Sequence, residues 1–313
     1  MMDFKFSFPP LSILGRYFIA LVFLISLLFY PGQNFYQTFY IPSNSQNSFY
    51  LPQLKPTSSR PISRHLPKPK FTAKAIVVQD INSKAMLFLK NPNTRLYPAS
   101  TTKIMTALVS LDAYSNLNQV VTITNEYLAR GHKIGLQPNE RITIKALLQG
   151  LLISSGNDAA LALAQNYPSG YAGFVQAMNQ KAIALGLTRT HFTNPSGVEE
   201  KDHYTSARDL AVLATIALSN DFIRQTVQTQ TLTITDISGH IKHVLINTNK
   251  LLGKVSGVQG LKTGWTPQAG ECLVTYVNRY NHPLIIVLLG SQDRFGETTT
   301  LINWIYQNYY WYN

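Results

Sequence analysis

Ser100 and Lys103 could together form an activated nucleophile. They stand three residues apart in "YPASTTKIM", just after Pro98, where an apolar helical pattern begins, so both side chains should project from one helix face. A serine hydroxyl is a weak nucleophile until a base takes its proton, and a lysine can do this when burial or a neighbouring cation lowers its pKa. Taken alone, the pair is better explained by a helix-capping serine followed by a solvent-facing lysine.

Two further short patterns favour the catalytic interpretation. Ser155-Gly156-Asn157 falls where two predicted helices are interrupted, and Lys262-Thr263-Gly264 falls on a predicted strand near the carboxyl end. Three such motifs in this order are typical of penicillin-binding proteins and class A β-lactamases, where the middle motif usually reads Ser-Asp-Asn. Lys262 would also be a second cation that disfavours the charged form of Lys103.

Longer stretches carry the resemblance beyond the three motifs. They are "YPASTTKIMTAL", "LLISSGNDAALALA", "HFTNPSGV", "HYTSARDLAVLA" and "GLKTGWTPQAGECLV". From about Ala75 to Trp304 the chain resembles the low-molecular-mass penicillin-binding proteins that act as serine D-alanyl-D-alanine carboxypeptidases, of the peptidase S11 type in the β-lactamase/transpeptidase-like superfamily. This resemblance implies a role for each matching residue.

Four of these residues would carry the catalytic steps. The resemblance implies that Ser100 attacks the carbonyl of the penultimate D-alanine of a peptidoglycan stem peptide and forms an acyl-enzyme. Lys103 would be the base, Ser155 would relay the proton to the leaving amine, and Asn157 would hydrogen-bond the substrate amide or the Lys103 side chain.

Five residues would bind the substrate. By the same resemblance, Thr263 and Arg294 hold its terminal carboxylate, and Lys262 adds positive charge. A peptide can also add to a sheet edge through backbone hydrogen bonds, and Gly264 would leave room for that approach. The backbone N–H of Trp265 and that of the nucleophile would form the oxyanion hole.

The implied function is that of a serine D-alanyl-D-alanine carboxypeptidase in cell-wall synthesis, with β-lactam antibiotics as covalent inhibitors. A DD-endopeptidase that cuts peptidoglycan crosslinks uses the same chemistry and stays an alternative. A β-lactamase is less favoured, because no E-x-x-L-N pattern lies between Ser155 and Lys262. The intact motifs argue against a non-catalytic wall-binding or antibiotic-sensing protein.

Hydrophobic periodicity predicts the elements that position these motifs. Residues 75–82 and 85–91 read as a β-hairpin, and β-rich runs return beyond Asp221. Between them, helical patterns follow Pro98, cover 143–167 with a break near Ser154 to Gly156, and continue over 170–186 and 205–219, before a last helix at 297–310. We therefore expect an α+β fold of the β-lactamase/transpeptidase-like type. Its antiparallel sheet would combine both chain ends, be flanked by helices and enclose an inserted all-helical lobe.

The amino terminus predicts export. Lys5 and Arg16 precede fourteen uncharged, mostly apolar residues, Tyr17–Tyr30, so residues 1–32 read as a signal or signal-anchor, and the lack of an A-x-A pattern favours an anchor. Residues 33–70 are rich in Pro, Ser, Asn and Gln and read as a basic linker. Residues 71–313 would form the catalytic domain, on the outer face of the membrane or secreted to the envelope.

Composition excludes several other classes. The net charge is +12, yet no Lys/Arg run with interleaved aromatics favours nucleic acid. Cys272 is the single cysteine, so neither an intrachain disulfide nor a cysteine-based zinc site can form. His240 and His243 are the only close-spaced histidines, and on a strand they point to opposite faces. We expect no metal and no cofactor.

Overall fold

The computed structural model describes residues 59–124 and 131–312, which lie within one compact unit, Gln53–Asn313. The expected signal or anchor, 1–32, and the larger part of the expected linker lie outside the described residues. Within the described part of the chain, no helix has the length and apolar character needed to cross a membrane.

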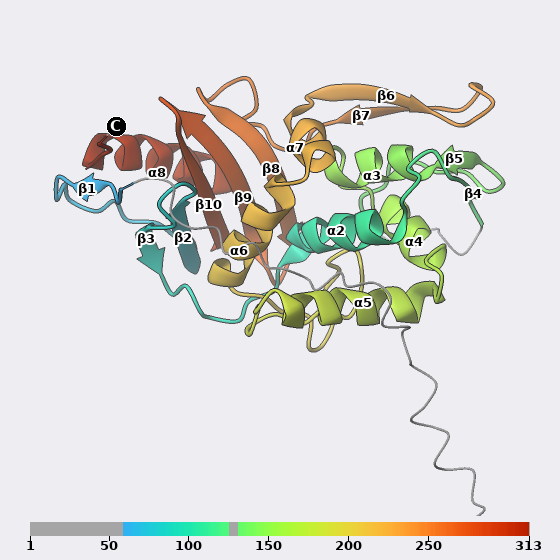
Figure 1. Cartoon of the computed structure of the whole chain (residues 1–313), viewed down its shortest axis with the longest axis horizontal. Helices are drawn as coiled ribbons and strands as arrows, with labels where there is room; N and C mark the ends of the chain where they lie inside the picture. Colours follow the sequence, from blue (N-terminus) through green and yellow to red (C-terminus); the bar gives the residue numbers. More distant parts are fainter. Residues whose placement is uncertain (1–58, 125–130, 313) are drawn as a thin grey trace, which may run out of the picture. The chain divides into compact units, whose positions relative to one another are not determined.

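A five-stranded antiparallel sheet joins the two ends of the domain (Figure 1). Its strand order is β3-β2-β10-β9-β8. The strands are β2 Ala75–Asp80, β3 Met86–Lys90, β8 Val258–Thr266, β9 Gly270–Arg279 and β10 His282–Ser291. The expected sheet built from both chain ends is thus confirmed, and β8, which carries the Lys-Thr-Gly motif, is an edge strand.

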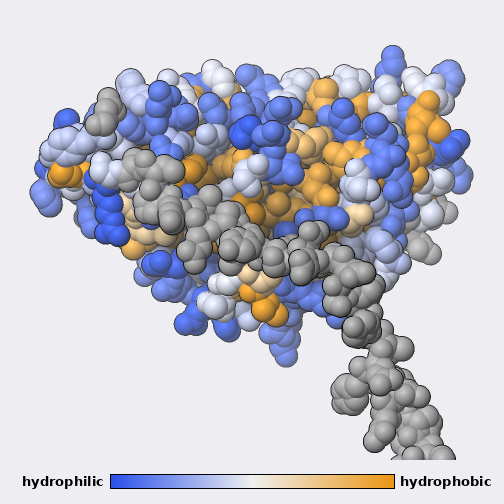
Figure 2. Space-filling model, in the orientation of Figure 1, coloured by the Kyte–Doolittle hydropathy of each residue, from blue (hydrophilic) through white to orange (hydrophobic). Residues whose placement is uncertain are grey.

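The sheet separates two hydrophobic cores. Side chains of β10 alternate between them, since Ile285, Val287 and Leu289 belong to one core while Leu284 and Ile286 belong to the other. Helix α8, Arg294–Asn308, packs in the second core through four side chains: Leu301, Ile302, Trp304 and Ile305. In the view of Figure 2, hydrophobic residues gather in the middle of the face and hydrophilic ones surround them.

The opposite side of the sheet carries the expected helical lobe (Figure 1). Its elements are η2 Ala99–Thr102, α2 Lys103–Ala113, α3 Ile144–Leu152, α4 Asn157–Gln165, α5 Gly170–Ala184 and α6 Ala207–Leu218. Thr143 caps α3 by accepting a hydrogen bond from the Ala146 N–H at 3.2 Å, and Ser206 caps α6 by accepting from the Asp209 N–H at 3.1 Å. The predicted helices and the break between α3 and α4 are confirmed.

Four features differ from the expectation. Helix α7, Asp221–Gln228, forms where strands were expected to resume. Its cap is Asn220, whose side chain accepts from the Ile223 N–H. Strands β4 Val120–Thr122 and β5 Arg141–Thr143 form a small hairpin that the sequence did not indicate. The predicted strands β6 Thr231–Thr235 and β7 Lys242–Ile246 pair with each other and stay apart from the central sheet. Helix α8 begins three residues earlier than expected, at Arg294.

Ordered packing begins before the expected domain start at Phe71. Strand β1, Ile62–Ser63, pairs with β11, Tyr309–Tyr310, at the end of the chain. The Leu66 N–H donates to Asn308 Oδ1 at 2.8 Å, and Trp304 Nε1 donates to the Pro67 carbonyl at 2.8 Å. Residues 62–67 are therefore held on α8, because their backbone groups find partners there despite the proline-rich composition.

This attachment predicts a stability difference between two asparagines of α8. Asn308 is buried, and its side chain accepts a hydrogen bond from the Leu66 N–H and donates one to Ser63 Oγ. Asn303 is exposed, and its Oδ1 accepts a hydrogen bond from Arg279 Nη1. Asn308→Ala should lower the free energy of unfolding by about 2 kcal/mol, and the control Asn303→Ala by less than about 0.5 kcal/mol. Urea denaturation measures both, and an unchanged Asn308→Ala midpoint would contradict the attachment.

Candidate active site

Ser100 lies at the start of the helix that carries Lys103, as the sequence predicted. It is the second residue of η2, which runs directly into α2. Ala99, just before it, has φ of 48°, a left-handed conformation that costs a non-glycine residue about 1–2 kcal/mol. This turn presents the half-buried Ser100 hydroxyl 2.8 Å from Lys103 Nζ.

The Lys103 side chain is completely buried, at 0% exposure, and its nitrogen touches three oxygens. Lys103 Nζ lies 2.8 Å from Ser100 Oγ, 2.6 Å from Asn157 Oδ1 and 2.7 Å from the Ser196 carbonyl. These groups come from three separate segments of the chain. None of them is a carboxylate, so among the residues that the structure describes the nitrogen has polar partners but no direct counter-ion.

Burial makes the charged form of both lysines unfavourable. It holds the pKa of Lys103 well below the ordinary lysine value, and the nearby Lys262 lowers it further, while Asp158 acts in the opposite direction. Lys262 is 1% exposed, and burial followed by the charge of Arg294 lowers its pKa to about 7. The site therefore contains two lysines that can lose a proton far more easily than lysines in water.

The Ser155–Asn157 segment turns sharply between α3 and α4. Ser155 has φ of 62°. A Cβ on Gly156 would lie 2.8 Å from Asp158 Oδ1 and 2.9 Å from Ile134 Cγ2, so a larger residue would displace these side chains. The Asp158 carboxylate accepts hydrogen bonds from three consecutive backbone N–H groups, those of Ile134, Gly135 and Leu136, at 2.9–3.1 Å. Asp158 thus stabilises the segment beside the site as well as standing in the first turn of α4.

Gly264 has a steric role that the sequence did not predict. A Cβ at this position would lie 3.0 Å from the Ser100 nitrogen and 3.0 Å from Ala99 Cβ. The missing side chain therefore makes room for the backbone of the nucleophile itself. This contact places the edge of β8 directly against the start of η2, which brings the Lys-Thr-Gly motif to Ser100.

The remaining predicted residues lie on or beside β8. Thr263 Oγ1 is 2.6 Å from Thr248 Oγ1, a partner that the sequence did not single out. Arg294 Nη1 donates to the Gly264 carbonyl at 2.7 Å, and its buried Nε has no hydrogen-bond partner among the described residues. The Trp265 side chain is 58% exposed at the edge of the strand. The structure thus brings all nine predicted site residues to one region.

The loop that contains Ser196 contacts Lys103, and sequence reasoning gave this loop no role in the site. Asn194 Oδ1 accepts from the backbone of Ser196 at 3.2 Å and of Gly197 at 2.8 Å, which folds the loop back on itself. Gly197 has φ of 85°, and a Cβ there would lie 1.9 Å from the Ala99 carbonyl. The stretch "HFTNPSGV" had signalled the loop, but a backbone carbonyl that contacts Lys103 leaves no trace in residue type.

His203 anchors the other side of η2. The Thr193 N–H donates to His203 Nδ1 at 3.1 Å, so Nε2 carries the proton and donates to Thr102 Oγ1 at 2.9 Å. Burial, with His191 second, lowers the pKa of His203 to about 4. The imidazole is therefore neutral near pH 7 and acts as a fixed support for the helix start.

The described residues offer no alternative chemistry based on metal or thiol. Among residues 59–124 and 131–312, no group of three His, Cys, Asp or Glu side chains is arranged to hold a metal ion. Cys272 is buried, and burial raises the pKa of its thiol to about 11. The Cys272 thiol is therefore protonated near pH 7.

A serine and a buried lysine beside a sheet edge define a class of acyl-transferring serine enzymes, and the fold agrees. The structure is similar to that of the Streptomyces K15 DD-transpeptidase, with a TM-score of 0.74 and 33% identity over 77% of this chain and 100% of that one. The family model described as D-alanyl-D-alanine carboxypeptidase, peptidase S11, matches residues 62–293. This chain belongs to that family of serine peptidases.

Curated relatives include both carboxypeptidases and endopeptidases. The chain is 35% identical to D-alanyl-D-alanine carboxypeptidase DacF of Bacillus subtilis over 76% of this chain and 63% of that protein. It is 34% identical to the D-alanyl-D-alanine carboxypeptidase of Streptomyces sp. strain K15, over 76% of this chain and 88% of that one. It is also 34% identical to the D-alanyl-D-alanine endopeptidase of Pseudomonas aeruginosa, over 73% of this chain and 76% of that protein.

The contact between Gly264 and the nucleophile predicts the effect of a single methyl group. Gly264→Ala should push β8 away from η2 and lower the rate of Ser100 acylation by a fluorescent penicillin about a hundredfold, because a misplacement near 1 Å suffices for such a loss. Gly239→Ala is the control: an added Cβ there meets no atom within 4 Å, and the φ of 76° limits its effect to backbone strain in the β6–β7 turn. It should leave the rate unchanged, and equal rates for all three proteins would refute the steric role.

Proposed function

We propose that this protein is a serine D-alanyl-D-alanine carboxypeptidase that removes the terminal D-alanine from peptidoglycan stem peptides. The observation that carries the proposal is the contact of buried Lys103 Nζ with Ser100 Oγ, Asn157 Oδ1 and the Ser196 carbonyl. Membership of the D-alanyl-D-alanine carboxypeptidase family supports the same reaction. β-Lactam antibiotics would acylate the same serine.

The three oxygens explain how Lys103 can act as the base. A neutral amine has two N–H donors and one lone pair. The carbonyl oxygens of Asn157 and Ser196 can only accept, so they take the two donors. The lone pair then faces Ser100, whose hydroxyl donates to it. Burial supplies the neutral form, so the proton of Ser100 passes to Lys103 as its oxygen attacks the substrate carbonyl.

Ser155 and Asn157 would complete the acylation step. In this proposal Ser155 relays the proton from Lys103 to the nitrogen of the departing D-alanine as the carbon–nitrogen bond breaks. Asn157 holds Lys103 in place, and its amide nitrogen can also meet the substrate amide. A water molecule then attacks the acyl-enzyme, Lys103 takes the proton of that water, and Ser100 leaves with its hydroxyl restored.

The β8 edge would orient the substrate. Lys262, Thr263 and Arg294 provide the positive charge and donors for the terminal carboxylate. The Ser100 and Trp265 N–H groups form the oxyanion hole, where loss of one donor costs about 3 kcal/mol in comparable enzymes. The close approach of Gly264 to the Ser100 nitrogen supports this pairing of donors.

The second candidate is a DD-endopeptidase that cuts peptidoglycan crosslinks. The 34% identity to the Pseudomonas aeruginosa D-alanyl-D-alanine endopeptidase supports it, and it equals the identity to the Streptomyces K15 carboxypeptidase. Both reactions pass through the same acyl-serine, and they differ in the group that leaves. D-alanine release from a simple peptide favours the carboxypeptidase, whereas cleavage of a crosslinked dimer alone favours the endopeptidase.

We further propose that the protein acts outside the cytoplasm. Peptidoglycan is the substrate of the family, and the basic-flanked apolar stretch Tyr17–Tyr30 would export the chain or anchor it to the membrane. In this arrangement residues 1–32 are the signal or anchor and residues from 33 on link it to the catalytic domain, which continues to residue 313.

Mass spectrometry of a penicillin adduct tests the assignment of Ser100 as the nucleophile. Full-length protein exposed to benzylpenicillin should gain one adduct, mapped by peptide analysis to Ser100, and should release D-alanine from a peptide ending in D-Ala-D-Ala. Ser100→Ala should lose both properties. Ser110, seven residues after Lys103 in α2, has no predicted role, so Ser110→Ala should keep them. An adduct at another residue, or one retained by Ser100→Ala, would refute the assignment.

The lowered pKa of Lys103 predicts a pH dependence of acylation. As pH rises through this pKa the neutral amine accumulates, so the acylation rate should increase and level off well below pH 10.5, the ordinary lysine value. Lys262→Met removes the neighbouring cation and should move the inflection to higher pH. Stopped-flow acylation from pH 5 to 10 measures both, and a flat profile would exclude Lys103 as the base.

A further inference from the structure

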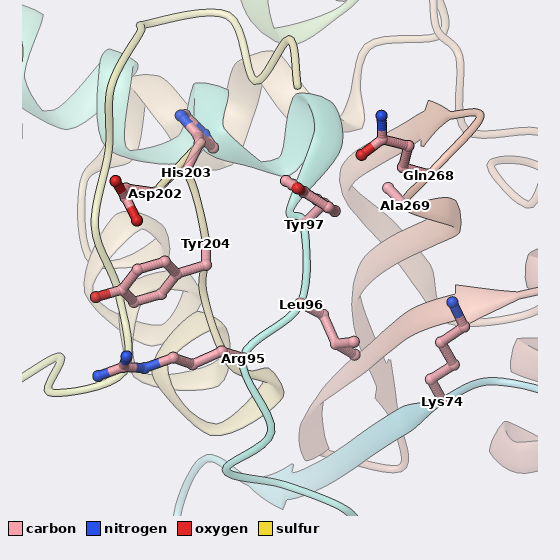
Figure 3. Close-up of a pocket in the computed structure, with 9 residues that line it drawn as sticks. All are labelled: Lys74, Arg95, Leu96, Tyr97, Asp202, His203, Tyr204, Gln268 and Ala269. Atoms are coloured by element: carbon pink, nitrogen blue, oxygen red, sulfur yellow. The ribbon is translucent and has the colours of Figure 1, made fainter. Parts of the chain in front are cut away.

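Two cavities lie toward opposite ends of strand β8. The first, of about 380 Å³, includes Tyr97 and His203 in its lining and lies against the start of η2, so it belongs to the candidate active site (Figure 3). The second, of about 340 Å³, is lined by Ser256, Gly257, Asn278, Arg279 and Tyr280. Gly257 stands seven residues before Gly264, which in a strand corresponds to about 20 Å. The residues of the second cavity have no role in the proposed reaction.

Tyr280, in the wall of the second cavity, adopts a backbone conformation that a bulky side chain disfavours. Tyr280 and Asn281 form the two-residue turn between β9 and β10, with φ of 56° and 61°. A turn with positive φ at both central positions favours asparagine and glycine, and a bulky residue there is rare. The Tyr280 side chain is 84% exposed, so burial in a core does not explain its presence. Backbone strain of this kind is an indication of function.

The β9–β10 turn is fixed on helix α8. The Tyr306 hydroxyl accepts from the Arg279 N–H at 3.2 Å and donates to the His282 carbonyl at 2.6 Å, so it joins both strands at the base of the turn. The Tyr280 and Tyr306 rings meet edge to face, with centroids 6.4 Å apart. This contact orients the Tyr280 ring and leaves most of its surface open. An aromatic ring that is oriented and open can stack on a ligand.

The cavity beside this ring contains polar groups that the protein itself leaves unused. Asn278 Oδ1 is buried and has no hydrogen-bond partner among the described residues, and an acceptor of this kind calls for a donor from outside the protein. Arg279 donates through Nε to the Ser256 carbonyl and through Nη1 to Asn303 Oδ1. In the described part of the chain, no carboxylate forms an ion pair with Arg279. The cavity therefore combines an acceptor and a cationic donor next to an open aromatic face.

This combination matches the chemistry of a saccharide. The C–H groups on the face of a pyranose ring can stack on an aromatic ring, whose face is electron-rich, and the hydroxyls at its edge need donors and acceptors beside that ring. The lining contains no aliphatic side chain that would favour a lipid. An acetamido substituent adds one N–H donor and one carbonyl acceptor, which complement Asn278 Oδ1 and the Arg279 guanidinium respectively.

We propose that this cavity binds an N-acetylated saccharide unit of a glycan strand. The Tyr280 ring would stack on the sugar, Asn278 Oδ1 would accept from the acetamido N–H, and Arg279 would donate to the acetamido carbonyl. The binding involves no step at Ser100, so the inference goes beyond the proposed function and does not rest on it. Together with that function, it would hold the enzyme on the polymer that carries the stem peptides.

Two tetrasaccharides test the ligand class. Tetra-N-acetylchitotetraose and cellotetraose share their linkage and differ in the acetamido group that replaces one hydroxyl on each ring. In an NMR titration with full-length protein, the Kd of the acetylated tetrasaccharide should be about fivefold lower, because its acetamido group makes an additional hydrogen bond. Equal Kd values, or no binding of the acetylated tetrasaccharide up to about 10 mM, would overturn the proposal.

Matched tyrosine substitutions connect the binding to this cavity. Tyr280→Asn removes the ring and introduces a residue that the turn favours, so it should raise the Kd of tetra-N-acetylchitotetraose about tenfold without lowering the thermal unfolding midpoint. Tyr312→Asn, at another exposed tyrosine that is not part of the lining, is the control and should leave the Kd unchanged. An unchanged Kd in Tyr280→Asn would contradict the assignment.

A third variant tests the contact with the acetamido group. Asn278→Ala should remove the difference in Kd between the two tetrasaccharides. Because Asn278 Oδ1 has no partner among the described residues, its loss should leave the protein folded, and the thermal unfolding midpoint measures this. A folded Asn278→Ala protein that keeps the full preference for the acetylated tetrasaccharide would exclude this contact.

Blocking the catalytic serine separates the two sites. Protein acylated by benzylpenicillin should bind tetra-N-acetylchitotetraose with an unchanged Kd, and a raised Kd would place the saccharide at Ser100 and overturn the assignment to the β9–β10 turn. The tetrasaccharides carry no peptide, so failure of the saccharide site leaves the proposed function intact. Absence of D-alanine release, in turn, would leave the saccharide result intact.

Discussion

The burial of Lys103 is the constraint on which the rest of the site depends. A charged amine in a place without water is expensive, and without a counter-ion in contact the cheaper solution is to lose the proton. The carbonyl oxygens of Asn157 and Ser196 accept hydrogen bonds from the Lys103 amine. Because these oxygens carry no net charge, they stabilise the ammonium form less than a carboxylate would. An amine with a lowered pKa is thereby held next to a hydroxyl, and this is the condition that the proposed serine acylation needs.

Close backbone packing makes that burial possible. Ala99 adopts a left-handed conformation, Gly197 lies against its carbonyl, and Gly264 lies against the Ser100 nitrogen. Each of these contacts excludes a larger side chain. The start of η2 is therefore compressed between the 194–197 loop and the edge of β8, and the strain at Ala99 is sustained by the surrounding packing.

The sheet gives this arrangement its rigidity. Because β8 is joined to β9, and β9 to β10, the Lys-Thr-Gly edge is supported by strands whose side chains fill cores on both faces. Hydrogen bonds then connect the β8 edge and the β8–β9 turn to neighbouring loops, from Thr248 to Thr263 and from Glu199 to the turn. The substrate edge and the nucleophile consequently keep a constant separation.

Local patterns were sufficient for much of the fold. The β2–β3 hairpin, the break between α3 and α4 and the helix from Ser206 onward are encoded by hydrophobic period, turn residues and caps within short windows. Helix α7 was not predicted, because its eight residues follow a capping asparagine inside a stretch that otherwise favours strands. The sequence also did not predict that residues 62–63 pair with the chain end, because a proline-rich sequence gives no signal for a partner more than two hundred residues away.

The sequence by itself determined which residue types could do the chemistry: a serine and a lysine at helical spacing, with two further motifs in a fixed order. Tertiary structure decided what those residues experience. Whether Lys103 is buried, which carbonyls it contacts and why Gly264 must be glycine all depend on segments far apart in the chain. The reason is physical, since a proton's free energy on an amine is set by the dielectric and charges around it, and these exist only after folding.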